Sequence, residues 1–470
     1  MTNSILQLVW ASALLAIVGT AAPLRADDDE GPVKLTLHPM AAPTPALKYR
    51  LLPEATKRLT GNAAVPYGKV TAEEMTYFKK YAQADVIDTW QEMPLDKIRA
   101  EKIPLPESSI RFLEEGAHCR YCDWQLPIGQ IPFYLIMLPD AQESRSYSRV
   151  LAVKARTEIA SGKFDEAIHT FQTNYALAQN VAQGQSLIHG LIGIAIGGLM
   201  FPQITEYVQQ PAAPNLYWAL TAMPSPLITM TDAVEVESEA LELSFPDVRD
   251  AEKASHTPEE WRTIFQSMAK NILEWNHAGD KPPVAKTPEE LDKICEEALP
   301  IAQRALIASG LPKEKVDAMP VYQVATIYSV HKYHSLFDEA AKCYSLPYPQ
   351  AIECIDATIA RAKDPSREDS EIIPITGQTL QALRATRGAI ARCDRQVALL
   401  RIVEALRLHA AGHEGKLPEK LADITEAPTP DDPVTGKPFE YHSAGDRASI
   451  TGPKAGGWEV NFEITMAKAE

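Results

Sequence analysis

Helix-start patterns recur along the middle of this chain, and they constrain its fold more than any other feature. Thr257-Pro-Glu-Glu260 and Thr287-Pro-Glu-Glu290 each place a capping hydroxyl three residues before a carboxylate, with proline at the first helical position. Thr71-Ala-Glu-Glu74 repeats the spacing without the proline. The sequence therefore predicts helices that begin near Thr71, Thr257 and Thr287.

The clearest pair of helices lies between Tyr147 and Gln183, with a break at Ser161-Gly162. Gly162 to Phe171 resembles the second helix of a tetratricopeptide repeat, although no second copy follows. The pattern predicts a helical hairpin. The apolar side chains of the second helix recur at helical spacing and are Phe164, Ile168, Phe171 and Tyr175.

Further helices are expected downstream of this hairpin. An apolar run from Leu187 to Phe201 contains glycines at positions 190, 193 and 197, which would let another helix approach closely. The run is interrupted by His189 and is shorter than a membrane span, so it predicts a buried core helix. The other predicted helices cover residues 227–243, 261–275, 291–309, 321–341 and 350–362.

The last part of the chain has its own pattern. Residues 364–378 are polar with two prolines and predict a linker. From Thr379 to Ala411 the sequence contains no proline, and Leu399, Ile402 and Leu406 fall on one helical face. Arg401, Glu404 and Arg407 fall on the opposite, polar face. Short strands are predicted at 438–442, 448–451 and 458–464.

The N-terminus predicts export. Residues 6–18 form an apolar run followed by small residues and an acidic stretch, which is the pattern of a cleavable secretory peptide. Cleavage is expected after Ala26 or Ala21. Because we find no later run of about 18 apolar residues, the sequence predicts no transmembrane span after cleavage. The predicted location is periplasmic or secreted.

Composition narrows the class of partner. The formal net charge of −16 would repel a phosphate backbone, so nucleic acid is an unsuitable partner. We expect a mainly α protein, an irregular helical bundle or solenoid of helical hairpins with a small α+β C-terminal module. The expected divisions are 1–26 signal peptide, 27–106 extended segment with the first helices, 107–363 helical domain, 364–378 linker and 379–470 tail.

Two resemblances add to this reading. Residues of about 46–249 resemble a family of exported helical bacterial proteins of unassigned function, through phrases such as Leu47-Lys-Tyr-Arg-Leu-Leu-Pro53 and Cys122-Asp-Trp124. From Thr379 onward the chain is similar to the tail of the type II secretion major pseudopilins. That similarity rests on a long helix, then Gly415-Lys-Leu-Pro418 and Asp432-Pro-Val-Thr-Gly436. The first resemblance implies no established activity, and the second implies a small α+β tail.

Six cysteines in an exported chain favour disulfides. Cys343 and Cys354 flank a proline-marked bend between two predicted helices, so they are the first choice for a pair. Cys119 and Cys122 form a lone C-x-x-C without the histidine of a haem site or the second C-x-x-C of a zinc ribbon. A structural role is predicted for both.

No other motif in the sequence clearly predicts a catalytic or metal-binding site. His331, His334 and Asp338 share a helical face at metal-like spacing, but without a further ligand nearby they predict a solvated or partly packed face. Ser186 lacks the closing glycine of a hydrolase elbow. The sequence predicts no catalytic, cofactor or metal residue.

The functional expectation follows from these points. An exported non-catalytic interaction or scaffold protein of the cell envelope is expected, with an envelope protein or peptide as partner. The alternative is an envelope hydrolase or carbohydrate-active enzyme whose carboxylates converge only in the fold. A pocket with two or more buried carboxylates would favour the enzyme. The oligomeric state stays open.

Overall fold

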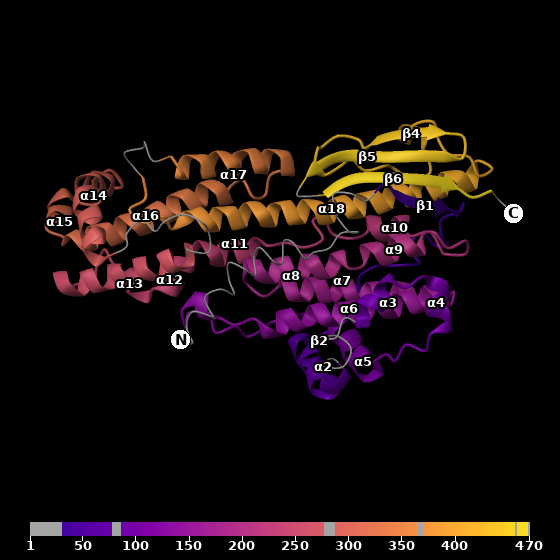
Figure 1. Ribbon diagram of the computed structural model, residues 1–470, viewed down its shortest axis with the longest axis horizontal. Coiled ribbons are helices and arrows are strands. Elements are labelled where there is room, and N and C mark those ends of the chain that lie inside the picture. Colours follow the sequence, from indigo (N-terminus) through magenta and orange to yellow (C-terminus); the bar gives the residue numbers. More distant parts are fainter. Residues whose placement is uncertain (1–30, 78–85, 277–286, 365–369, 456–457, 469–470) are drawn as a thin grey trace. The chain divides into compact units, whose positions relative to one another are not determined.

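The computed structural model describes residues 31–77, 86–276, 287–364, 370–455 and 458–468. The predicted signal peptide at 1–26 lies outside these residues. The described chain is mainly helical and carries a small C-terminal α+β module, as the sequence predicts (Figure 1).

The described chain forms two compact units, and the boundary between them falls inside one helix. Unit 1 contains residues 126–137 and 231–387, and unit 2 contains residues 31–125, 138–230 and 388–470. The long helix α18 (Thr376–Gly412) contributes to both, since the division falls after Arg387. The units therefore do not follow the predicted ranges 107–363 and 379–470.

Unit 1 consists of helices. Their bounds are η3 Phe133–Leu135, α11 Thr231–Ser238, α12 Ala240–Ser244, η4 Pro246–Val248, α13 Pro258–Asn276, α14 Pro288–Ala308, α15 Lys313–Asp317, α16 Val321–Ala341 and α17 Tyr348–Ala362. The two proline-containing caps are confirmed. Thr287 Oγ1 accepts from the Glu290 amide, and Thr257 and Glu260 cap each other reciprocally.

Unit 2 combines helices with two small sheets. Its helices are η1 Ala55–Lys57, α2 Ala64–Tyr77, α3 Val86–Glu92, α4 Leu95–Ala100, α5 Glu107–Ala117, α6 Pro139–Ala160, α7 Phe164–Ala182, α8 Leu187–Gly198, α9 Phe201–Tyr207, α10 Tyr217–Thr221 and η5 Leu421–Asp423. Its strands are β1 Val33–Leu37, β2 Leu59–Asn62, β3 Cys119–Tyr121, β4 Glu440–Ala444, β5 Arg447–Ala455 and β6 Trp458–Met466.

The expected helix start at Thr71 is wrong, because Thr71 lies inside α2. The helix begins earlier, at Ala64, whose amide donates to Asn62 Oδ1 at 3.1 Å. Asn62 therefore supplies the capping oxygen at the start of this helix, and Thr71 does not cap it.

The predicted hairpin of unit 2 is confirmed as α6 and α7. The turn between them contains Gly162, whose φ of +70° lies in the left-handed region that glycine adopts most readily. Ile168, Phe171 and Tyr175 on α7 are buried, as the helical spacing predicts.

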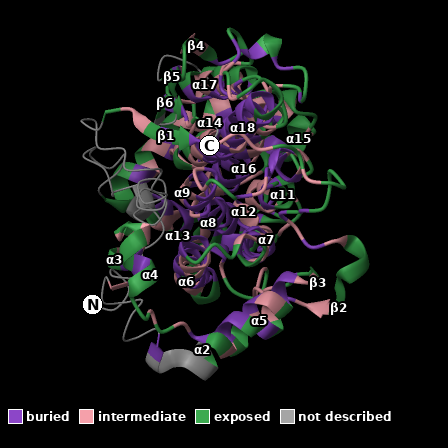
Figure 2. Ribbon diagram, turned by 90° about the vertical axis from the view of Figure 1, so that its right-hand side faces the viewer, coloured by how far each residue is buried: buried purple, intermediate pink, exposed green. Residues whose placement is uncertain are grey.

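Helix α8 packs closely beside α7. A Cβ atom placed on Gly193 would lie 2.6 Å from the backbone oxygen of Ala178, so only glycine fits there. The stretch Leu187–Tyr207 is long and apolar enough to cross a membrane by length and composition alone, but 83% of its most apolar window is buried inside the fold. Figure 2 draws α8 in the colour of buried residues. This agrees with the expected core helix.

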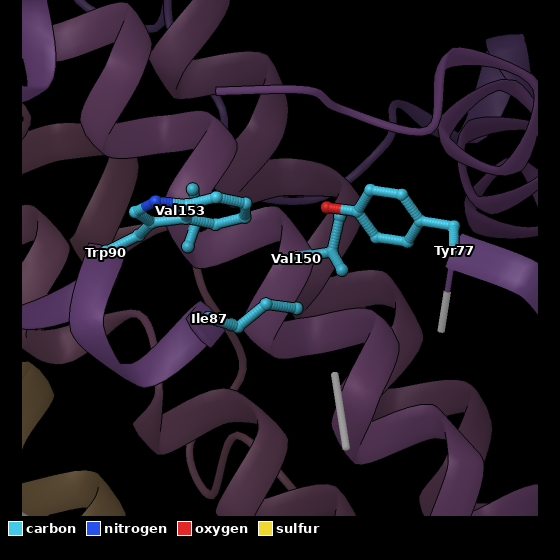
Figure 3. Close-up of a cluster of buried hydrophobic side chains, with 5 residues drawn as sticks. All are labelled: Tyr77, Ile87, Trp90, Val150 and Val153. Atoms are coloured by element: carbon cyan, nitrogen blue, oxygen red, sulfur yellow. The ribbon is translucent and has the colours of Figure 1, made fainter. Parts of the chain in front are cut away.

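A cluster of buried apolar side chains joins α2, α3 and α6 within unit 2. Ile87 and Trp90 of α3 pack against Val150 and Val153 of α6, with Tyr77 at the end of α2 (Figure 3). The nearby Arg156 guanidinium donates to the backbone oxygens of residues 90, 91 and 93, which are carbonyls at the end of α3. The buried Arg156 cation thus supplies hydrogen-bond donors to carbonyl groups at the C-terminus of α3 that the helix itself leaves without a partner.

The C-terminal sheet has the strand order β1-β6-β5-β4 and lies along the C-terminal half of α18 (Figure 1). The three strands predicted from residue 438 onward are confirmed as antiparallel neighbours. The fourth strand, β1, comes from the N-terminal segment and pairs in parallel with β6, Val33 opposite Phe462. The tail module is therefore completed by residues from the other end of the chain.

The predicted linker is packed over its described part. Ile372 and Ile373 are buried, and the Glu371 carboxylate accepts from the amides of Ile375 and Thr376 at the start of α18. The polar face predicted for the helix also differs, since Glu404 and Arg407 are fully buried. Both faces of this helix segment are covered, because residues 213–216 and the backbone of His38 bond to Glu404 and Arg407.

Candidate functional site

The Cys119-x-x-Cys122 pair lies at strand β3 and in the loop after it, in unit 2. Neither thiol is disulfide-bonded, and Cys119 Sγ donates to the Glu115 carbonyl at 3.5 Å. Burial raises the pKa of both thiols. Because the thiolate is the reactive form and the metal-binding form, this environment favours inert, structural cysteines.

Cys343 and Cys354 lie at disulfide distance, as the sequence predicts. Their Cα atoms are 6.2 Å apart, with Cys343 just after α16 and Cys354 on α17 of unit 1. Cys295 and Cys393 are buried and not bonded to another cysteine. The predicted bend at Leu346 and Pro347 thus brings two consecutive helices together at a covalent link.

His331, His334 and Asp338 all lie on helix α16, but the two histidines contact different carboxylates. His331 Nε2 lies 2.9 Å from Glu252 Oε1, whereas His334 Nε2 lies 2.5 Å from Glu242 Oε1. Each histidine therefore pairs with its own carboxylate. The pairs connect α16 to the segment 242–252 within unit 1, which is a packing role.

Ser186 and His189 form a contact that sequence reasoning did not anticipate. Ser186 Oγ lies 2.8 Å from His189 Nδ1 and accepts from the His189 amide at 3.3 Å, so it caps helix α8. Both residues are buried, and desolvation lowers the pKa of His189 to about 4. A substrate would have to displace the protein interior to reach this pair, so we assign it to structure.

Glu404 is a fully buried carboxylate with a complete set of partners. Its oxygens accept from the Leu216 amide at 2.9 Å, from Asn215 Nδ2 at 2.8 Å and from Arg407 Nη1 at 2.9 Å. Burial raises its pKa, an effect that the Arg407 cation opposes. These contacts hold segments of unit 2 to α18, and they leave Glu404 committed to structure.

A cavity in unit 2 has an apolar lining. No Asp or Glu lines it, and the lining residues with polar atoms in their side chains are Gln396, Tyr175 and Cys393. The remaining lining residues are Gly197, Phe201, Leu227, Val397 and Leu400. This cavity does not have the paired acids that the enzyme alternative requires.

Three side chains that sequence reasoning overlooked converge at the end of α18. His409 lies in the last turn of α18 and His413 is the first residue after the helix, and their rings stack with centroids 3.9 Å apart. Glu426 follows η5 and reaches both, with Oε2 at 3.2 Å from His409 Nδ1 and Oε1 at 3.3 Å from His413 Nδ1. The His-x-x-x-His spacing is visible in the sequence, but the carboxylate comes from a later loop.

Three comparisons with known proteins found no match. A scan against family models gives no match, and neither a search of curated proteins nor a search of solved structures gives one. The resemblances at 46–249 and from Thr379 onward therefore stay sequence-based expectations, and the function is argued from the structure's own side chains.

Proposed function

We propose that this chain is an exported, non-catalytic interaction protein of the cell envelope, periplasmic or secreted, that binds a protein or peptide. The surface at strands β2 and β3 carries this proposal. Leu59, Val65 and Tyr121 are exposed there by 49%, 60% and 51% respectively. Large apolar side chains exposed on neighbouring segments are typical of interaction sites.

The backbone places these three side chains in one region of unit 2. Leu59 on β2 lies opposite Cys119 on β3, and the Ala63 amide donates to the Tyr121 carbonyl at 2.9 Å. Val65 follows two residues later, in the first turn of α2. We call Leu59, Val65 and Tyr121 the β2–β3 surface.

Charge near this surface suggests the chemistry of the partner. Arg58 and Arg120 are exposed and directly precede Leu59 and Tyr121, although the chain as a whole carries a net charge of −16. Tyrosine and arginine are the residues that most often dominate binding energy at interfaces. The proposed partner is therefore a segment with apolar and acidic side chains.

The interior charges support binding over catalysis. Glu404 is held by Asn215, Leu216 and Arg407, and Asp432 by Arg395, so these buried acids already serve the packing of unit 2. The hydrolase alternative needs two converging carboxylates that face a substrate. No specific contact among the described residues favours it over the interaction role.

Co-purification from envelope extract tests the proposal. The variant Leu59→Ser/Val65→Ser/Tyr121→Ser should lose a partner that the wild-type chain retains, with an unchanged circular dichroism spectrum. Leu346→Ser is the matched control, because Leu346 is also an exposed apolar side chain, at 39%, but lies in unit 1. Equal recovery of every co-purifying protein by wild type and triple variant would contradict the proposal.

A further inference from the structure

We propose that His409, His413 and Glu426 form a binding site for a borderline-soft divalent transition metal ion, with Zn²⁺ as the reference ion. One donor atom from each residue lies within 4.8 Å of the others, and the three residues come from the end of α18 and the loop after η5. This site shares no residue with the cysteine pairs or with the His331–Asp338 face of α16, and it does not depend on the proposed interaction role.

The distances fit a metal ion. A tetrahedral Zn²⁺ about 2.0 Å from each nitrogen or oxygen ligand would hold its ligand atoms roughly 3.3 Å apart. The contacts of Glu426 with the two imidazoles measure 3.2 and 3.3 Å, at Oε2 and Oε1 respectively. Both contacts are thus of the length expected between two ligands of one ion, and the stacked imidazole rings would have to turn out of their stack for both Nδ1 lone pairs to point at that ion.

The local backbone holds this arrangement. The His409 carbonyl lies 2.9 Å from His413 Nδ1, a contact that ties His413 to the last turn of α18. Glu426 Oε2 accepts from the Thr425 amide at 3.1 Å, and both Ile424 and Ala427 beside it are buried. The carboxylate packs directly against Gly412, since a Cβ atom there would lie 3.4 Å from Glu426 Oε1, at van der Waals contact.

The donor set selects the class of ion. Two imidazoles and one carboxylate suit Zn²⁺, Cu²⁺, Ni²⁺ or Co²⁺, whereas Mg²⁺ and Ca²⁺ require mostly oxygen ligands. His409 is buried, but the side chains of His413 and Glu426 are 48% and 27% exposed. A fourth coordination position would therefore face solvent and take water or a donor group from a partner.

The competing interpretation is that the three residues form only a hydrogen-bonded cluster at a helix C-terminus. His413 Nδ1 lies 2.9 Å from the His409 carbonyl, which is a contact of that kind. In a purely hydrogen-bonded cluster the two stacked imidazoles would share a single carboxylate as partner. A metal ion would instead bind the Nδ1 lone pair of each ring, so the contact of His413 Nδ1 with the His409 carbonyl would have to be given up on binding.

Isothermal titration of Zn²⁺ into the metal-stripped, tag-free chain tests this site. We expect one high-affinity Zn²⁺ per chain, with His413→Ala and Glu426→Gln each weakening binding at least about tenfold. His442→Ala is the matched control, because His442 is an exposed histidine of unit 2 on β4, and this change should leave the affinity unchanged. Excess Mg²⁺ should not compete.

A second readout keeps the test independent of folding defects. Zn²⁺ should raise the thermal midpoints of the wild type and of His442→Ala more than that of Glu426→Gln, and Co²⁺ should give the visible absorption spectrum of a four-coordinate site with the wild type and His442→Ala but not with Glu426→Gln. Circular dichroism checks that each variant is folded. Absence of a stoichiometric Zn²⁺ site, or equal Zn²⁺ affinity of wild type, His413→Ala and Glu426→Gln, would overturn the proposal.

Discussion

The Arg395 guanidinium donates to Asp432 Oδ2 at 2.8 Å, and both side chains are buried inside unit 2. Arg395 also donates to the Pro453 carbonyl on β5, so one cation on α18 holds both the sheet and the turn that begins at Asp432. Asp432 in turn accepts from the Val434 amide. The pair joins the helix of the tail module to its sheet.

Asp432→Asn should destabilise unit 2 strongly. The change leaves the Arg395 cation buried without its counter-charge, a situation that typically costs about 3–5 kcal/mol. Asp431→Asn is the matched control, since Asp431 is exposed beside it and should change the free energy of unfolding by less than about 0.5 kcal/mol. Urea unfolding followed by circular dichroism measures both. Equal midpoints for the two variants would show that the pair is dispensable.

Gly193→Ala should destabilise the packing of α7 on α8. The new methyl group would lie 2.6 Å from the Ala178 backbone oxygen, which cannot move without displacing α7, and overpacking of this kind costs about 1–3 kcal/mol. Gly198→Ala is the control, because its methyl group would meet only Gln396 Oε1, at 3.9 Å. Thermal unfolding should separate the two, with a lower midpoint for Gly193→Ala alone. A wild-type midpoint for Gly193→Ala would refute the close contact.

The contact between His334 and Glu242 should make the stability of unit 1 depend on pH. The hydrogen bond to Glu242 raises the pKa of His334 above its usual value of 6.5, with smaller support from the charges of Asp338 and Glu239 and against the effect of burial. Because the folded-state pKa is the higher one, the stabilisation is complete below about pH 6.5 and is lost as the pH rises through the folded-state pKa.

An NMR titration of the His334 ring measures this shift. Glu242→Gln should lower the His334 pKa, whereas Glu252→Gln should leave it in place, because Glu252 contacts His331 and not His334. The half-exposed environment limits the effect on stability to about 1 kcal/mol or less. A His334 pKa that is the same in wild type and Glu242→Gln would show that Glu242 is not its partner.

The disulfide between Cys343 and Cys354 should form in the native compartment. The two cysteines are 11 residues apart in the sequence. A disulfide that closes a loop of this size stabilises the folded chain by roughly 3 kcal/mol, in the account that attributes the effect to the lower entropy of the unfolded chain. Mass spectrometry of non-reduced peptides should find residues 343 and 354 linked, with Cys393, which is buried, slow to alkylate. Six freely alkylated thiols in protein taken from its own compartment would rule the link out.

Local signals in the sequence predicted much of the helical structure. Thr257 and Thr287 mark real helix starts, and α16 has the predicted bounds Val321–Ala341, because capping and helical spacing depend on neighbouring residues only. The helix start predicted at Thr71 is wrong because Asn62, which lacks the Thr-x-x-Glu spacing, caps the helix seven residues earlier, at Ala64.

Long-range contacts were not predictable in the same way. Strand β1 pairs with β6 from the opposite end of the chain, and the burial of Glu404 and Arg407 depends on segments near His38 and Ala213. The candidate site also depends on a contact between residues that are distant in the sequence. His409 and His413 stand only four residues apart in the sequence, but Glu426 joins them through the loop that folds back after Gly415.

Photo-cross-linking from position 121 tests the central claim, which is that the β2–β3 surface binds an envelope partner. A benzophenone side chain in place of Tyr121, in the full chain expressed in its own cells, should give one discrete cross-linked species in the envelope fraction. Leu59→Ser/Val65→Ser in the same chain should abolish this species, and the probe at the exposed position of His442 should not produce it. Absence of a species specific to position 121, or its survival in Leu59→Ser/Val65→Ser, would contradict the account.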